Sequence, residues 1–139
     1  MSRDLRVLKA SLLAGAAYFL GVSVAHMLGV KVPGLFVYFD VPSFAYQDRI
    51  ISFLAFGWAV FLFAASTDPM KQDVLVKAVL VAGAAAVAGL AIVNLTTDFS
   101  ALRPGIAQSA FWLQTAGAFF YWAWLVFFAA RAGILRDER

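Results

Sequence analysis

The feature that most constrains this chain is the stretch from Lys77 to Asn94, which is apolar, rich in Ala and Gly, and uncharged beyond its first residue. A helix of about 20 apolar residues crosses the hydrocarbon core of a bilayer, so this stretch predicts a membrane span. Three further stretches are similarly long and nearly free of charge. We therefore predict four spans, near residues 8-30, 49-67, 74-95 and 105-130, with outer loops at 31-48 and 96-104.

A second copy of this stretch runs from Lys9 to His26. Offset by 68 positions, the copies share a lysine, two glycines and a polar last residue: Lys9 with Lys77, Gly15 with Gly83, Gly21 with Gly89, and His26 with Asn94. Each copy precedes a loop and another apolar stretch, a pattern typical of tandem hairpins related by an axis along the membrane normal. We predict an all-α integral membrane protein, a four-transmembrane-helix bundle built from two tandem, parallel-repeat helical hairpins.

Small residues recur within the two copies. Ala17 and Gly21 are four positions apart, and so are Ala85 and Gly89. This spacing places both small residues on one helix face, where they let two helix backbones approach closely in lipid. We expect these four residues to pack the first span against the third, with the general abundance of Ala and Gly in membrane helices as the alternative explanation.

The composition supports membrane insertion and excludes several kinds of chemistry. Apolar residues make up 63% of the 139 positions and charged residues only 14%, whereas a soluble domain is about half apolar and a quarter charged. There is no cysteine, which excludes disulfides, thiolate nucleophiles and thiolate metal sites. The net charge of +3 is modest and the basic residues lie at span ends, so nucleic acid is not an expected partner.

The basic residues also predict an orientation for a single membrane domain, 1-139. Eight of the eleven Lys and Arg residues lie in the head, the turn between the second and third spans, and the tail. Because cytoplasmic segments carry the excess of positive charge, we predict cytoplasmic N- and C-termini. A signal peptide ending near Ser23-Val24-Ala25 is the competing reading of the first stretch, but its internal copy favours a retained span.

The span centres carry no Asp, Glu, Lys or Arg, which argues against a proton-coupled pump. A lone His26 cannot supply two axial ligands to a haem, and no cluster of His and carboxylates indicates zinc. No nucleophile, phosphate or dinucleotide motif is present. We predict no catalytic residue, no metal site and no cofactor, although a lipophilic ligand is compatible with these absences.

Polar residues do gather on the outer side of the predicted bundle. We take these as candidate ligand-binding residues for a head group or small molecule: His26, Asp40, Arg49, Asn94, Asp98 and Arg103. The alternative is structural, with Asp48 capping the second span, the arginines paired to loop carboxylates, and His26 and Asn94 bonded to helix ends. A membrane enzyme using His26 with Asp40 or Asp98 as an acid–base pair is a further, less favoured hypothesis.

Two tryptophans, Trp58 and Trp122, lie well inside their spans, although interfacial tryptophans normally lie at span ends. They complete the candidate ligand-binding set as a wall for a quinone, pigment or lipid between the hairpins, with the aromatic first loop as a lid. The alternative is ordinary packing or lipid contact.

These patterns favour a non-catalytic structural or accessory subunit of a membrane assembly, or a homo-oligomer. The alternative is a binder or carrier of a lipophilic small molecule between the hairpins. Membrane lipid is the expected partner, with other membrane subunits as further candidates. The layout of spans is similar to that of several small bacterial membrane families, DoxX-like proteins among them, and this likeness implies a bacterial inner (cytoplasmic) membrane.

Overall fold

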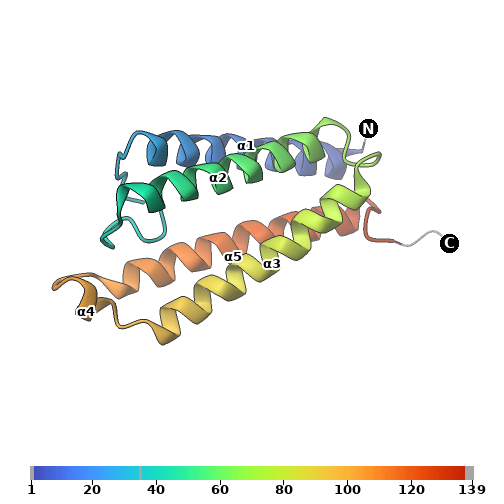
Figure 1. The fold of residues 1–139 in the computed structure, drawn as a ribbon. Coiled ribbons are helices and arrows are strands. Elements are labelled where there is room, and N and C mark those ends of the chain that lie inside the picture. The colour runs from blue at the N-terminus through green and yellow to red at the C-terminus, as the bar shows by residue number, and fades with distance from the viewer. Residues whose placement is uncertain (1, 35, 137–139) are drawn as a thin grey trace.

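The computed structural model describes residues 2–34 and 36–136, and within them it contains helices and their connections. Four long helices run back and forth along one direction (Figure 1): α1 (Arg3–Met27), α2 (Ala45–Thr67), α3 (Asp73–Thr96) and α5 (Gln108–Arg131). A short helix, α4 (Phe99–Leu102), lies between α3 and α5. All four long helices are long and apolar enough to cross a membrane, which fits a multi-pass membrane protein. The ends of the predicted domain, at residue 1 and residues 137–139, lie outside the described residues.

The first two helices begin earlier than their apolar stretches. α1 begins at Arg3 because the Ser2 hydroxyl accepts a hydrogen bond from the Leu5 N–H, at 3.2 Å. α2 begins at Ala45, where the Gln47 side chain accepts a bond from the Phe44 N–H, at 2.9 Å. The expected role of Asp48 as a cap is therefore wrong. Asp48 lies inside the first turn of α2, and its carboxylate is available for contacts with other elements.

Of the last two long helices, α3 begins within one residue of its expected start and α5 begins later than expected. Asp68 ends α2 as its C-cap, and α3 begins at Asp73. The last span, expected near 105-130, does not begin at residue 105. Gly105 has a φ of +86°, a left-handed conformation that suits glycine and cannot continue into a helix, and α5 begins at Gln108.

Two hairpins, α1–α2 and α3–α5, meet closely at one end and diverge at the other (Figure 1). We call the end with both chain termini the termini end, and the end with loops 28–44 and 97–107 the loop end. The larger buried cluster contains residues from all four long helices, among them Leu12, Leu62, Leu80 and Leu125. A second cluster nearer the loop end contains only residues of α1, α2 and loop 28–44, with Val22, Phe36 and Ala55 at its centre.

Two glycines let aromatic side chains of α5 reach the backbones of α1 and α3. A Cβ added at Gly15 would lie 2.1 Å from the Tyr121 hydroxyl oxygen, and one at Gly83 would lie 2.9 Å from Cδ1 of Trp122. The Tyr121 hydroxyl donates to the Ser11 carbonyl at 2.9 Å, and Trp122 Nε1 donates to the Leu80 carbonyl at 2.8 Å. Tyr121 thus attaches α5 to α1 of the first hairpin, and Trp122 attaches α5 to α3, its partner in the second hairpin.

The small residues expected to join the first and third spans do not do so within the described chain. Ala17, Gly21 and Ala85 are exposed, and a Cβ added at Gly21 or Gly89 would meet nothing within 4 Å. Helix α1 packs mainly on α2 and α5, and α3 packs mainly on α5 and α2. The two helices are not major partners, because aromatic side chains from α5 occupy the interior that a close α1–α3 contact would need.

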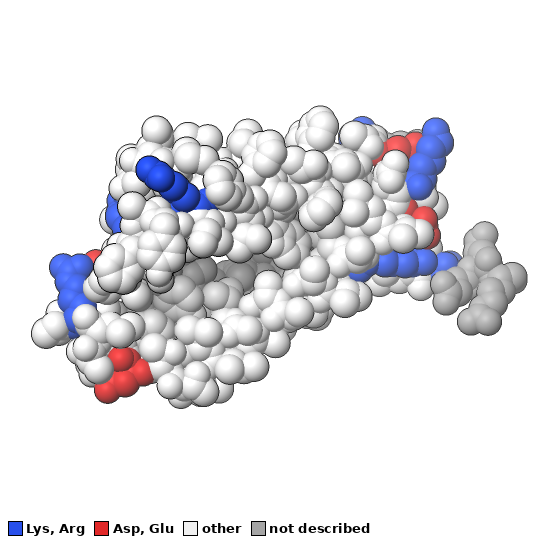
Figure 2. Space-filling model, viewed as in Figure 1, with Lys and Arg blue, Asp and Glu red and all other residues white. Residues whose placement is uncertain are grey.

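Charged side chains on the face shown in Figure 2 gather toward the two ends and leave the middle of that face uncharged. The exposed middle is rich in large apolar side chains from all four long helices, including Leu54, Val81 and Phe120. An apolar belt between two charged ends matches the layers of a bilayer, where charges are costly in the hydrocarbon core.

Candidate functional site

A histidine–aspartate pair lies where α1 ends and α2 begins. His26 Nδ1 is 3.1 Å from Asp48 Oδ1, and the two side chains are only 10% and 11% exposed. A carboxylate can only accept, so Nδ1 carries the hydrogen of this bond, and Nε2 is the ring nitrogen left for another partner. The His26 ring also lies against Phe36 from loop 28–44, with ring centroids 4.2 Å apart. The His26 ring is therefore held in place by its bond to Asp48 and by its contact with Phe36.

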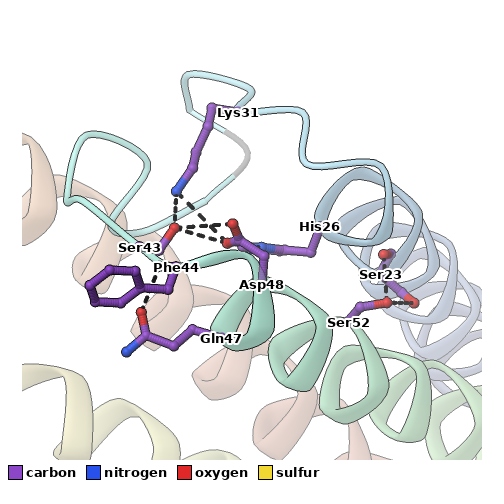
Figure 3. Close-up of polar contacts among 8 residues, drawn as sticks. All are labelled: Ser23, His26, Lys31, Ser43, Phe44, Gln47, Asp48 and Ser52. Carbon is purple, nitrogen blue, oxygen red and sulfur yellow. Dashed lines mark hydrogen bonds and ion pairs between the residues drawn. The ribbon is translucent and has the colours of Figure 1, made fainter.

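Loop 28–44 supplies two more partners to the same carboxylate (Figure 3). The Ser43 hydroxyl lies 3.0 and 3.1 Å from the two oxygens of Asp48. The Lys31 ammonium donates to the Ser43 hydroxyl and lies 3.8 Å from Asp48 Oδ1. A buried carboxylate is costly unless it is paired and hydrogen-bonded, and here histidine, serine and lysine meet that requirement together.

A pair of serines lies deeper in the same hairpin (Figure 3). Ser52 Oγ donates to the Ser23 carbonyl at 2.9 Å, and the two hydroxyl oxygens are 3.2 Å apart. Ser23 precedes His26 by about one turn and Ser52 follows Asp48 by about one turn, so the two pairs occupy one shared interface. The polar contacts thus fix the register of α1 against α2.

The cluster forms one wall of a cavity of about 600 Å³ at the loop end. Its polar lining comes from His26, Lys31, Ser43, Gln47 and Asp48. The remaining lining is mostly aromatic and aliphatic, and comes from α1, α2 and the loop: Tyr18, Phe19, Val22, Phe36, Val37, Tyr38, Phe39, Val41, Pro42, Ile50 and Ile51. A mainly apolar hollow with a few convergent polar groups is the common form of a small-molecule site.

The arrangement is suited to binding rather than to catalysis. In a hydrolase triad the histidine stands between the nucleophile and the carboxylate, whereas here Asp48 stands between Ser43 and His26. Lys31 is an unsuitable base for Ser43, because its ammonium donates a hydrogen bond to that hydroxyl. Among the described residues, no group of three or more His, Asp or Glu side chains could hold a metal ion.

A second polar cluster lies between the loop and the other hairpin. The buried Asn94 donates from its amide to the Thr115 hydroxyl at 3.0 Å and accepts from the Tyr38 hydroxyl at 3.0 Å. Gln108 donates to the Asn94 carbonyl at 2.8 Å. The Tyr38 ring packs against Phe99 and Phe111, at centroid distances of 5.4 and 5.1 Å. Loop 28–44 is thereby attached to α3 and α5.

The other charged candidates lie apart from the His26 cluster. Arg103 pairs with Asp40 at 3.3 Å, and Arg49 is exposed on α2. Asp98 caps α4, and hydrogen bonds from the Ser100 hydroxyl and the Ala101 N–H lower the pKa of its carboxyl. The expected pairing of His26 with Asp40 or Asp98 is therefore not formed. Asp48 is the partner because it lies one turn into α2, directly across from the end of α1.

The two tryptophans do not share a site. Trp58 stacks on Phe19 of α1, with ring centroids 5.7 Å apart and planes 18° apart, and it lines a separate hollow between α2 and α3. Trp122 is used in packing, through its contact with Gly83 and its bond to the Leu80 carbonyl. The structural alternative thus accounts for Trp122, while Trp58 remains next to a cavity.

Sequence reasoning missed Asp48 as the partner of His26, and it missed Lys31 and Ser43 as further partners of Asp48. A signal was present for the hairpin interface, because Ser23 and Ser52 are polar residues in apolar stretches, each one turn from a titratable residue. No such signal marks Ser43 or Lys31. The irregular path of loop 28–44 brings these two residues together, and no helical or strand spacing encodes that path.

Comparison of the chain with protein-family models, with curated proteins and with solved structures gave no match. The geometry of the loop-end cavity is therefore the basis for its proposed role.

Proposed function

We propose that this protein binds a lipid-soluble small molecule in the loop-end cavity and does not transform it chemically. The observation that supports this most strongly is a mainly apolar hollow with His26, Lys31, Ser43 and Asp48 at its polar wall. The carboxylate of Asp48 lies beside the Lys31 ammonium, so these two groups offset each other's charge and the wall still offers hydrogen bonds. Such a wall suits a polar but uncharged head group on an apolar body.

We also propose a bacterial inner membrane as the location, with both termini in the cytoplasm. Most of the Lys and Arg residues fall at the termini end, and positively charged segments remain on the cytoplasmic side. The loop-end cavity then faces outward. The two-hairpin repeat stays a prediction in this proposal.

An accessory subunit or a homo-oligomer is the second candidate. It is supported by the exposed small residues Ala17, Gly21 and Ala85. Because their side chains are short, another helix could approach the backbones of α1 and α3 closely at these positions.

One experiment tests both candidates: mass spectrometry and absorbance spectroscopy of protein extracted gently from its native membrane. We expect a stoichiometric lipophilic molecule in the wild type and its loss from Asp48→Asn, because the amide cannot hold His26, Ser43 and Lys31 in the same way. Asp73→Asn is the matched control, because Asp73 pairs with Lys77 at the other end of the molecule. It should retain the molecule.

Bulk membrane lipid alone in the wild type would overturn the binding proposal. A co-purifying polypeptide or a defined oligomer without a small molecule would favour the accessory subunit instead.

A further inference from the structure

One face of α2 connects the loop-end cavity to a second hollow. Gln47, Ile51, Leu54, Trp58 and Phe61 are spaced three or four positions apart, so they lie in a single row along the helix. The first two line the loop-end cavity, and the last three line the hollow between α2 and α3. Phe19 of α1 strengthens the connection, because it lines the first cavity and stacks on Trp58 of the second.

The second hollow has a volume of about 450 Å³ and lies within the membrane-spanning part of α2 and α3. Its lining is apolar throughout: Phe53, Leu54, Gly57, Trp58, Phe61, Leu75, Ala78, Val79 and Ala82. Small residues make it hollow, since Gly57, Ala78 and Ala82 leave space between the larger side chains. We call this hollow the α2–α3 groove.

From this row of side chains, which runs from one hollow to the other, and resting on the proposed function, we infer that the ligand is a tailed ring of the prenyl quinone class. Its head ring lies in the loop-end cavity and its tail follows the row on α2 into the α2–α3 groove. The groove offers a head group only the indole N–H of Trp58, whereas the cavity has several polar side chains, so the head fits the cavity and the tail fits the groove.

The lining of the loop-end cavity selects the head. Lys31 and Asp48 compensate each other's charge, so a phosphate head would meet no net positive charge. Tyr38, Phe36 and Phe39 provide aromatic surface for a flat ring. The Lys31 ammonium is a donor, and His26 Nε2 is the ring nitrogen not used by Asp48, so the oxygens of a ring can bond to both.

The test is photo-crosslinking in nanodiscs. The probe is a prenyl quinone with a diazirine at the end of its tail, and a phospholipid with the same diazirine reports ordinary lipid contact. With the wild type, we expect the quinone to label peptides that contain residues 53–61 and 75–82 several-fold more than α5, and the phospholipid to label all four helices more evenly. Because lipid tails are as apolar as the groove, the preference arises from packing and is moderate in size.

Gly57→Phe should fill the groove, since a Cβ there meets nothing within 4 Å, and should move the label to other helices. Gly117→Phe is the matched control, because Gly117 is an α5 glycine with equally open surroundings that lines neither hollow. It should leave the labelling unchanged. Asp48→Asn should abolish the preference by releasing the head.

The outcomes separate the two proposals. Quinone binding that depends on Asp48, with label spread evenly over the helices or concentrated on α5, would overturn the tail position and leave the proposed function in place. Equal labelling of the groove by the phospholipid would overturn the choice of a ring. Quinone binding that does not depend on Asp48 would overturn both.

Discussion

At the scale of single residues, glycine has two different uses in this chain. Gly15 is buried beneath Tyr121, where a methyl group would displace the hydroxyl that bonds to Ser11. Gly21 has open space around it in the same helix. The sequence shows both glycines within similar small-residue runs, and only the position of the α5 aromatic side chains distinguishes them.

Gly15→Ala should therefore destabilise the protein by about 1–3 kcal/mol, because overpacking forces Tyr121 out of place. Gly21→Ala should be neutral or stabilising by up to about 1 kcal/mol, because alanine favours a helix more than glycine does. Reversible unfolding in mixed detergent micelles measures both. A clear loss of stability or a change of oligomeric state in Gly21→Ala would show instead that a neighbouring chain packs on that face.

The candidate site also shows what single residues can reveal before a structure is known. His26 and Asn94 were recognisable as polar residues at the ends of apolar stretches, and both lie in buried or partly buried polar clusters. Their partners were not recognisable. The start of α2 depends on the bond between the Phe44 N–H and the Gln47 side chain, which the apolar pattern does not reveal. The pattern therefore predicted a loop at Asp48, although Asp48 lies in α2.

At the scale of elements, loop 28–44 joins the first hairpin to the second at the loop end. Tyr38 makes this contact with its hydroxyl on Asn94 and its ring against Phe99 and Phe111. The same loop contains Lys31 and Ser43 of the candidate site. Attachment of Tyr38 to α3 therefore helps to set the shape of the cavity.

Tyr38→Phe should keep the ring contacts and remove the hydroxyl bond, leaving the buried Asn94 oxygen without this donor. We expect a cost of about 1–2 kcal/mol and faster hydrogen exchange across the loop, measured by mass spectrometry. Tyr46→Phe is the control, because Tyr46 is exposed near the start of α2. Equal exchange in the two variants would contradict an anchoring role for Tyr38.

At the scale of the whole molecule, four helices of membrane length were predictable and are confirmed, because length and apolar content determine them. The predicted contact between the first and third spans is not formed. Small-residue spacing shows where a helix can be approached closely, but it does not identify the helix that packs there. The divergence of the hairpins at the loop end was equally hidden, because no residue spacing within the spans encodes how one hairpin is inclined to the other.

The proposed orientation can be tested with single cysteines, because the chain has none of its own. Ala101→Cys lies in α4 at the loop end, and Met70→Cys lies in the turn between α2 and α3 at the termini end; both positions are exposed. A membrane-impermeant maleimide should label Ala101→Cys in intact spheroplasts and should label Met70→Cys only after permeabilisation. The reverse pattern would show that the termini face outward.

The His26, Lys31, Ser43 and Asp48 contacts all lie within the first hairpin, as do the paired serines Ser23 and Ser52. A ribosome completes this hairpin before it begins α3, and at roughly 5–20 residues per second the remaining half takes several seconds more. The polar wall can therefore form in the membrane while the second half is still being translated. During those seconds the nascent hairpin contains every group of the polar wall, and the later half adds the anchor for Tyr38 and the far side of the groove.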